Sequence, residues 1–378
     1  MSAALPLSDV RVVEFCHTIM GPSCGFVLAE LGADVIKVEA APYGDATRRL
    51  SGFAAGFFTT FNRSKRSILV DLKSEHGREI VKRLIERSDV LVENYGPGTL
   101  DRLGYGAEVV EKINPKIIYC SLKGFLHGPY KRRPALDEIV QYMTGLAYMT
   151  GLPGRPLRAG SSIVDIMGGV FGVVAILAKL RERDRTGRGG QMTSSLFESA
   201  AFLVAQHMAA EAVTGVAPPP MSMRHAAWGV YETFPTGDGT PIFIGVTSNQ
   251  QWERFCRALG REDLLKDPDF GDNNARVAAK ERLLPLVGEI IRSHSYKKLA
   301  EIFERESIPF SPVAKPGDLF DDPHLNAHGW LEDTELPDGR HTKLPGIPIE
   351  FDDHKLGIRM QPPKLGEHTD EILRELGS

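Results

Sequence analysis

The segment Gly32–Glu39, with the sequence GADVIKVE, indicates the kind of sheet on which this chain is built. Its second half, Val35–Val38, is a short β-prone run, and a similar run, Val10–Phe15, precedes it. Between the two runs a predicted turn at Met20–Pro22 is followed by a stretch compatible with a helix, Cys24–Leu31. A strand, a helix and a strand in this order form a β-α-β unit, which joins two parallel strands.

The same alternation continues along the chain. A predicted helix, Glu75–Arg87, leads into the strand Val90–Glu93, and another, near Ala107–Ile113, leads into the strand Ile117–Ser121. Strands that alternate with helices of this length predict an α/β fold with a doubly wound, Rossmann-like parallel sheet. Ligands of such sheets bind where the strands end, so the residues after each strand are the first candidates for a site.

A smaller α+β domain is predicted in the second half of the chain. The long apolar helix Ile163–Arg183 and a further helix, Ser194–Ala210, precede the proline-rich segment Thr214–Pro220. After it, the runs Tyr231–Phe234 and Ile242–Val246 flank a glycine-containing turn, which predicts a β-hairpin. We therefore expect a second domain to begin near this hairpin.

The bulk properties are those of a globular enzyme. The 378 residues are 42% apolar and 25% charged, and the net charge of -4 gives no footprint for nucleic acid or an anionic membrane. The four cysteines form no Cys-x-x-Cys pair, so we expect no disulfide framework, no zinc site and a cytoplasmic setting. We expect no export or anchoring segment, because the longest apolar stretch, near Gly168–Ala178, is too short to span a bilayer.

The residues after the strands favour phosphate groups over a dinucleotide. Glu39 would suit a ribose, but Cys16–Pro22 contains no Gly-x-Gly-x-x-Gly, so we do not expect NAD. Cations that follow strands could pair with phosphates, although a solvated surface position is the alternative for each of them. These cations are Lys37, Arg63, Lys65, Arg66, Lys73 and Arg102.

Three separated segments carry a resemblance to a known family: Gly32–Glu39, Asn62–Ile68 (NRSKRSI) and Ser162–Gly169 (SIVDIMGG). Together they resemble the class III CoA-transferase family, also called CaiB/BaiF, which contains formyl-CoA and carnitine CoA-transferases. The resemblance implies an enzyme that moves coenzyme A between an acyl-CoA and a carboxylic acid without a metal or a redox cofactor. It also implies a homodimer whose two chains interlock like linked rings.

The resemblance also implies a domain plan and a set of coenzyme A contacts. It places residues 1–212 in a large domain, residues 213–330 in a small domain with its linkers, and residues 331–378 back in the large domain. Some members have an arginine directly after the strand-end glutamate, where this chain has Ala40, so Arg48 and Arg49 are the candidates to replace it. The positions that match coenzyme A contacts are Val70, Lys73, Asn94, Tyr95, Arg102 and Leu103.

Asp165 lies at the start of the apolar helix. A carboxylate there interacts with unpaired backbone N–H groups, which would keep it ionised, and a helix cap is the favoured interpretation from the residues alone.

The resemblance instead places Asp165 on the nucleophilic aspartate of the family, with Gly160, Gly168 and Gly169 as small residues that admit a thioester. It implies an aspartyl-acyl anhydride and an aspartyl-CoA thioester, with backbone N–H groups near Ile19–Gly21 as candidate donors to the oxyanions.

Asp137 is the second carboxylate to consider. A racemase branch of the same superfamily uses a histidine and an aspartate here to move the α-proton of an acyl-CoA, but the place of the histidine is taken by Leu136. A hydrocarbon cannot accept a proton, so a transferase is favoured over a racemase, and Asp137 would orient the site or cap a helix. His17 and His127 are expected to be polar contacts. A non-catalytic acyl-CoA binding protein is the third alternative.

Two departures from the family narrow the substrate. Ile19 and Pro218–Met223 stand where the oxalate-using branch has a glutamine and a run of glycines, so formyl-CoA and oxalate are disfavoured. Arg158, shortly before Asp165, offers a cation for the free end of a dicarboxylate. This favours succinyl-CoA and a C4 or C5 dicarboxylic acid as substrates.

Overall fold

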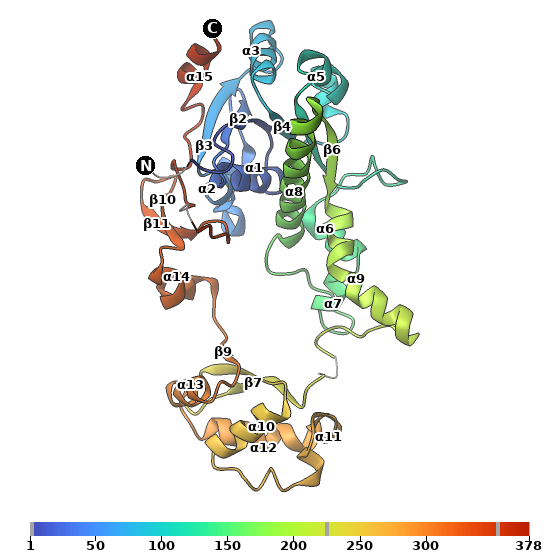
Figure 1. Cartoon of the computed structure of the whole chain (residues 1–378), viewed down its shortest axis with the longest axis vertical. Coiled ribbons are helices and arrows are strands. Elements are labelled where there is room, and N and C mark those ends of the chain that lie inside the picture. The colour runs from blue at the N-terminus through green and yellow to red at the C-terminus, as the bar shows by residue number, and fades with distance from the viewer. Residues whose placement is uncertain (1–3, 224–226, 353–355, 378) are drawn as a thin grey trace. The chain divides into compact units, whose positions relative to one another are not determined.

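The structure is a computed structural model that describes residues 4–223, 227–352 and 356–377 (Figure 1). The chain forms two compact units. Met1–Ser222 and Pro323–Ser378 make up the first unit, and Met223–Asp322 makes up the second. The first unit therefore combines segments from both ends of the chain.

A six-stranded parallel sheet organises the first unit, with the strand order β3-β2-β1-β4-β5-β6. The strands are β1 Arg11–Phe15, β2 Asp34–Ala40, β3 Lys65–Val70, β4 Val90–Glu93, β5 Ile118–Lys123 and β6 Gly190–Ser195. The strands after β1 lie first on one side of it and then on the other. This is the doubly wound order predicted from the sequence.

Helices cover both faces of the sheet. They are α1 Met20–Glu30 and α8 Ile163–Thr186 on one face, and α3 Glu75–Glu86, α5 Ala107–Ile113 and α15 Thr369–Leu376 on the other. Val12 pairs in register with Val35 and Val90, and all three belong to the core under α1 and α8. Their neighbours Val13 and Leu91 belong to the second core, because successive side chains of a strand point to opposite faces.

Shorter elements complete the first unit. They are the 3-10 helices η1 Ala46–Arg49 and η2 Gly52–Ala54, the helices α2 Phe57–Phe61, α4 Thr99–Leu103, α6 Asp137–Met143, α7 Leu146–Thr150 and α14 Pro323–Ala327, the longer helix α9 Leu196–Thr214, and the antiparallel strands β10 Leu331–Glu335 and β11 His341–Pro345.

The second unit has its own antiparallel sheet and its own core. The strands β7 Val230–Pro235, β8 Pro241–Val246 and β9 Phe310–Pro312 are paired in that order, and β7 and β8 form the hairpin predicted from the sequence. The other elements are α10 Asn249–Ala258, η3 Pro268–Phe270, α11 Asn273–Ala278, α12 Lys280–Arg292, α13 Tyr296–Arg305 and η4 Pro316–Asp321. Phe255 and Phe303 stack in this core.

Glycines on α8 allow a close approach to α1. A Cβ atom added at Gly169 would lie 2.1 Å from Ser23 Oγ and 2.6 Å from the carbonyl oxygen of Met20, and one at Gly168 would lie 2.5 Å from Met20 Cε. The structure therefore assigns Gly168 and Gly169 to helix packing, not to space for a thioester as expected. Gly160 differs, because a Cβ atom there would meet nothing within 4 Å.

The contacts between the two helices also fix their direction. Gly168 lies against Met20, and one turn later Gly172 lies against Cys24, where an added Cβ would be 3.3 Å from the sulfur. The contacts advance toward the C-terminus along both helices, so α1 and α8 run parallel. Because α1 directly follows β1, both helices begin at the carboxyl edge of the sheet.

α1 begins earlier than predicted. The structure extends the helix to Met20, whereas the sequence predicted a turn at Met20–Pro22. Pro22 is the third residue of the helix, and a proline in the first turn removes no hydrogen bond because those N–H groups have no intrahelical partner.

α8 is longer than the apolar stretch that the sequence suggested. Its 24 residues are long and apolar enough to cross a membrane by length and composition alone, so the prediction that this segment is too short is wrong. In the structure 39% of its most apolar window is buried, and its glycines pack on α1. One side of the helix therefore packs in the core of the first unit, where Val173, Ile176 and Leu180 are buried, while Val174 on the other side is exposed.

We predict that Gly169→Ala destabilises the first unit. The new methyl group would press on the carbonyl oxygen of Met20, and overpacking of this kind costs about 1–3 kcal/mol. Thermal and urea unfolding measure the loss. Gly288→Ala in α12 is the matched helical control, because its added Cβ meets only ordinary contacts at 3.5 Å and beyond. Equal stability of Gly169→Ala and wild type would contradict the packing.

Candidate functional site

The carboxyl ends of β1 and β4 form the switch point of the sheet. The chain leaves β1 toward β2 on one side, and β4 begins the series on the other side. In open parallel sheets this divergence creates the crevice in which ligands bind. The residues that follow the two strands, His17 and Asn94, therefore lie at the expected position of a site.

Asn94 ties the two strand ends together. Its Oδ1 accepts a hydrogen bond of 3.0 Å from the backbone N–H of His17, and its Nδ2 donates one of 2.8 Å to the carbonyl oxygen of His17. The ring of Tyr95 packs on the imidazole with 5.4 Å between the ring centroids. Asn94 thus holds the backbone of the loop after β1.

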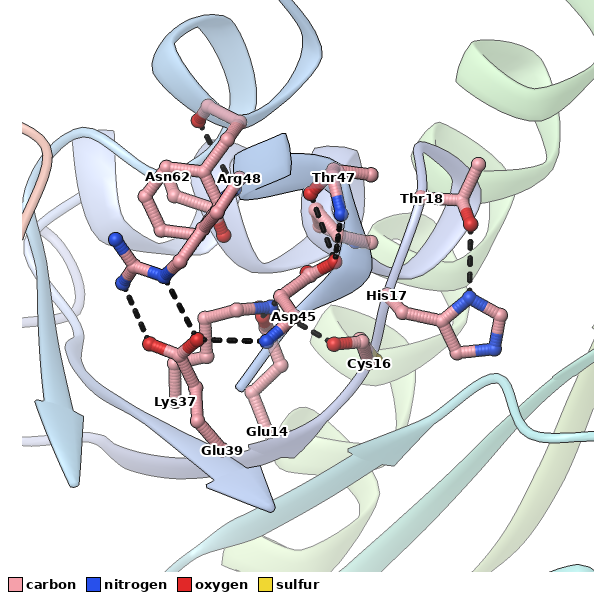
Figure 2. A network of polar contacts seen from close by, with 12 residues as sticks. Glu14, Cys16, His17, Thr18, Lys37, Glu39, Asp45, Thr47, Arg48 and Asn62 are labelled. Atoms are coloured by element: carbon pink, nitrogen blue, oxygen red, sulfur yellow. Dashed lines mark hydrogen bonds and ion pairs between the residues drawn. The ribbon is translucent and has the colours of Figure 1, made fainter. Parts of the chain in front are cut away.

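The imidazole of His17 makes a polar contact with the hydroxyl group of the next residue. Its Nδ1 lies 2.8 Å from Thr18 Oγ1 (Figure 2). Burial lowers the pKa of His17 and Lys37 lowers it further, while Asp45 opposes both. A lowered pKa keeps the imidazole neutral at neutral pH.

The first turn of α1 presents uncapped backbone N–H groups. Ile19 is the N-cap residue, is buried, and has no side-chain oxygen with which to cap the helix. The N–H groups of Met20 and Gly21 lie in the first turn, where no intrahelical acceptor exists. They remain the candidate oxyanion donors at this edge of the sheet.

Asp137, not Asp165, caps α8. Asp137 Oδ2 accepts hydrogen bonds from the backbone N–H groups of Val164 at 2.9 Å and Asp165 at 3.0 Å. Its other oxygen accepts from Gln141 Nε2 at 2.6 Å, and Gln141 Oε1 accepts from the N–H of Ala159 at 2.8 Å. The buried Asp137 thus fulfils the capping role considered for it, although for a different helix from its own.

This arrangement leaves the carboxylate of Asp165 without a hydrogen-bond partner in the described part of the chain. Asp165 lies in the first turn of α8 and is partly exposed. Burial is the main cause that raises its pKa, to about 7, and the neighbouring Asp137 carboxylate raises it further, while Arg158 opposes both. The direction is opposite to that expected for a carboxylate at a helix start, because Asp137 already occupies the N–H groups that would have stabilised the charge.

Arg158 lies near both carboxylates. Its Nε donates to the carbonyl oxygen of Ala159 at 3.0 Å, and its Nη1 is 3.8 Å from Glu138 Oε2. The side chain is 26% exposed, so its guanidinium remains accessible to a ligand. Its charge is close enough to lower the pKa of Asp165.

Four of the cations predicted to follow strands have structural partners instead. Lys37 and Lys65 are fully buried and pair with Glu14. Arg63 is also buried and donates to the carbonyl oxygen of Pro345 at 2.6 Å. Arg66 pairs with Asp34, Glu371 and Glu375 at the amino edge of the sheet. The phosphate interpretation is therefore wrong for these four residues.

The two arginines proposed to replace the one missing at position 40 differ in accessibility: one is held by structural partners and the other is exposed. Arg48 donates two hydrogen bonds to Glu39 and one to the carbonyl oxygen of Pro363, and it covers the ring of Phe58 (Figure 2). Arg49 is exposed, donates a hydrogen bond to the carbonyl oxygen of Tyr43 and lies over the ring of the same residue. Of the two, only Arg49 is accessible.

The remaining predicted contacts lie at or after the carboxyl ends of two strands, β3 and β4. Val70 is the buried last residue of β3, and the exposed Lys73 follows it. Arg102 and Leu103 end the short helix α4 after β4, and Arg102 is exposed. All these residues therefore lie along one edge, but their side chains are not gathered around a single cavity.

Arg102 lines a cavity of about 990 Å³. The cavity lies on the face of the sheet that carries Tyr119 and Ser121, and His127 also lines it. Lys123, Lys131 and Arg132 add further positive charge to its wall. Glu93, Asp101 and Glu108 also line the wall, and Lys123 pairs with Glu93, so the cavity carries charges of both signs.

No group of three or more His, Cys, Asp or Glu side chains suited to a metal ion occurs in residues 4–223, 227–352 and 356–377.

The sequence did not point to Glu14, which pairs with both buried lysines. A charged residue inside the apolar run Val10–Phe15 was the available signal.

Comparisons with known proteins agree with this arrangement. The model of CoA-transferase family III matches residues 7–369. An acyl-CoA transferase from Fusarium pseudograminearum is 36% identical, over 98% of this chain and 85% of its own length. A succinate–glutarate CoA-transferase from Agrobacterium fabrum is 34% identical, over 98% of this chain and 96% of its own length. The crystal structure of a CaiB/BaiF family protein from Brucella suis has 35% identity and a TM-score of 0.88, and covers 99% of this chain and 100% of that one.

We predict that Asp165→Asn stabilises the protein at neutral and alkaline pH. The pKa of Asp165 is about 7 in the folded chain and about 3.9 in an unfolded one. The folded state therefore binds the proton more tightly, and wild-type stability falls as the pH rises between these values. Asn removes this loss, so we expect a gain of roughly 2 kcal/mol near pH 8 that disappears near pH 4.

Thermal unfolding across this pH range tests the prediction. Glu182→Gln, near the C-terminal end of α8 and 55% exposed, is the control, and its difference from wild type should not change with pH in this way. A gain for Asp165→Asn that is independent of pH would contradict the raised pKa.

Proposed function

The chain belongs to CoA-transferase family III, and on that basis we propose that this enzyme moves coenzyme A from succinyl-CoA to a C4 or C5 dicarboxylic acid. The name of the relative from Agrobacterium fabrum, which pairs succinate with glutarate, supports dicarboxylates as the substrate class. The observation that carries the proposal is Asp165, a carboxylate of raised pKa at the start of a helix that another carboxylate caps.

In the proposed reaction Asp165 is the covalent carrier. Its carboxylate attacks the thioester carbonyl of the donor, forming an aspartyl-acyl anhydride and releasing CoA thiolate. The thiolate attacks the aspartyl carbonyl, which gives an aspartyl-CoA thioester and frees the donor acid. The acceptor carboxylate then repeats these two steps in reverse, so that acyl-CoA leaves and Asp165 is regenerated. Atoms and charge balance without a metal or a redox cofactor.

The environment of Asp165 suits this role. A carboxylate that is desolvated and has no hydrogen-bond donor is more basic and more nucleophilic than one in water, and a pKa near 7 leaves a substantial fraction ionised at neutral pH. The uncapped N–H groups of Met20 and Gly21 begin the neighbouring helix at the same edge of the sheet. We propose that they stabilise the oxyanion formed in each acyl transfer.

Arg158 is the proposed partner for the free carboxylate of the substrate. It is accessible, and its charge acts on Asp165. A guanidinium group can bind a carboxylate through two parallel hydrogen bonds, which would orient a dicarboxylic substrate relative to the nucleophile.

The proposed binding site for coenzyme A lies along the carboxyl edge of the sheet. Lys73 and Arg102 are exposed there, and Arg102 lines the cavity of about 990 Å³. We propose that they bind the phosphate groups of coenzyme A, with Val70, Asn94, Tyr95 and Leu103 as the neighbouring contacts.

A homodimer is part of the proposal. Large apolar side chains are exposed along α8 and α9, among them Val174 at 57% and Phe202 at 65%, and a second copy would cover them. The interlocked form of the dimer, the cytoplasmic setting and the absence of nucleic-acid and membrane partners remain predictions.

We expect Asp165→Ala to bind acyl-CoA but to reduce CoA transfer to background, because the variant lacks the carboxylate proposed to form the anhydride. The assay uses succinyl-CoA with glutarate as acceptor. Wild type incubated with succinyl-CoA alone should also give a mass adduct on the peptide that contains Asp165. The matched control is Glu182→Gln, near the C-terminal end of α8, which should keep both signals. Turnover of Asp165→Ala within a few-fold of wild type would exclude the covalent route.

The racemase alternative gives a different result in deuterated water. With a 2-methylacyl-CoA we expect no exchange of the α-proton, because Leu136 occupies the position of the second base. Mass spectrometry of the recovered acyl-CoA measures the exchange. Rapid exchange without acceptor-dependent CoA transfer would favour the racemase, whereas acyl-CoA binding without exchange, transfer or adduct would favour a binding protein.

A further inference from the structure

Three fully buried charged side chains lie between the sheet and the first turns of α1. Glu14 of β1, Lys37 of β2 and Lys65 of β3 each have 0% exposure. Glu14 Oε1 lies 3.4 Å from Lys37 Nζ, and Glu14 Oε2 lies 2.7 Å from Lys65 Nζ. One carboxylate therefore joins two ammonium groups from neighbouring strands (Figure 2 labels Glu14 and Lys37). We call these three residues the buried charge cluster.

Each ammonium group holds one end of the loop between β1 and the first turn of α1. Lys37 Nζ donates to the carbonyl oxygen of Cys16 at 2.7 Å, and Lys65 Nζ donates to that of Pro22 at 2.9 Å. Cys16 and Pro22 bracket His17, Ile19 and the candidate oxyanion donors. Since Glu14 connects the two lysines, the cluster fixes the two ends of this loop relative to each other.

The middle of the loop requires such support. Thr18 has a φ of +67°, a left-handed conformation that is a clear outlier for a β-branched residue. A strained residue keeps such a conformation only where the surrounding structure determines it, and it is often found at functional sites. The hydrogen bonds from Asn94 to His17 hold one side of Thr18, and the buried charge cluster holds the ends.

A glycine in α1 makes room for this cluster at a position where a side chain could otherwise pack. A Cβ atom at residue 25 would lie 1.8 Å from Glu14 Oε2, so Gly25 of α1 lets the helix lie directly on the carboxylate. Apolar residues in place of a buried ion network are often as stable or more stable, so stability alone gives no reason for these charges. The hydrogen bonds of the two lysines to the ends of the loop give a functional reason for these charges.

We propose that Glu14, Lys37 and Lys65 are positioning residues, which hold the loop Cys16–Pro22 so that the start of α1 faces the reacting group on α8. The inference rests on the proposed function, because it assigns the loop to the transfer reaction. The three side chains are buried and touch no substrate, so they act only through the loop. Their loss should lower kcat more than it changes KM for acyl-CoA, because misplacement of about 1 Å can cost on the order of 100-fold in rate.

The test uses a charge-balanced pair of substitutions in the full-length enzyme. Lys65→Met alone would leave an oxygen of Glu14 unpaired, so it is combined with Glu14→Gln, while Lys37 keeps its ion pair with Asp45 at 2.9 Å. We expect kcat to fall about 10- to 100-fold and KM to change less than about 3-fold. Hydrogen exchange of the hydrogen-bonded backbone amides within residues 17–23, those of His17 and Ser23, should accelerate, a readout that needs no activity.

The matched control is the double variant Asp34→Asn with Arg66→Met, which removes the ion pairs of these two residues from the amino edge of the same sheet. It should lose stability without a change in kcat or in exchange at residues 17–23. If the first double variant does not fold, Glu14→Asp is used, because a side chain shorter by one methylene cannot reach both lysines; its kcat should fall about 3- to 10-fold.

Each outcome separates the two proposals. Unchanged kcat and unchanged exchange in the cluster variants, with a normal adduct on Asp165 in wild type, would overturn the positioning role and leave the proposed function intact. Absence of the Asp165 adduct and of CoA transfer in wild type would overturn the proposed function. Equal losses of kcat in the cluster and control variants would assign the cluster to general stability and would also overturn the inference.

Discussion

The close approach of α1 and α8 is the constraint on which the site depends. The two helices can run parallel and nearly in contact only because Gly168, Gly169 and Gly172 present no side chain to Met20, Ser23 and Cys24. A parallel pair begins at one edge, so the first turns of both helices meet at the carboxyl edge of the sheet. That edge is also where β1 and β4 diverge, and where Asn94 joins the two strand ends. Helix packing and sheet topology therefore select the same place.

Two neighbouring carboxylates at this edge have different hydrogen-bond partners, and this difference sets the pKa of Asp165. Asp137 takes the helix-start N–H groups of α8 and is satisfied by them and by Gln141. Asp165 lies beside this filled cap, so it receives the repulsion of Asp137 without the benefit of the N–H groups, and its pKa rises to about 7. A basic, unpartnered carboxylate is what acyl transfer through an anhydride requires. The capped carboxylate would be a poor nucleophile, because its lone pairs are already engaged.

Burial decides the role of the cations, and the sequence does not show burial. Lys37, Lys65 and Arg66 looked like surface cations after strands, yet Glu14 and Asp34 hold them in the structure. Only Lys73 and Arg102 of the predicted phosphate partners are exposed. Glu14 lies 23 residues from one of its lysines and 51 from the other, so its pairing depends on the order of the strands. Lys37 and Lys65, which the sequence suggested as phosphate contacts, instead donate hydrogen bonds to the two ends of the loop after β1.

The sequence alone determined the sheet and its order of winding, because periodic apolar runs and the helices between them depend on neighbours along the chain. It also predicted the hairpin that opens the second unit, and the resemblance of the segment Ser162–Gly169 to a known family singled out Asp165 as the proposed nucleophile. It could not predict the helix that Asp137 caps, the side on which Gly168 and Gly169 pack, or the direction of the pKa shift of Asp165. These depend on contacts between residues far apart in the chain, such as the hydrogen bonds from Val164 and Asp165 to Asp137, 27 and 28 residues away. Local pattern fixes the elements, whereas desolvation and pairing, which set the chemistry, arise only when the elements are packed together.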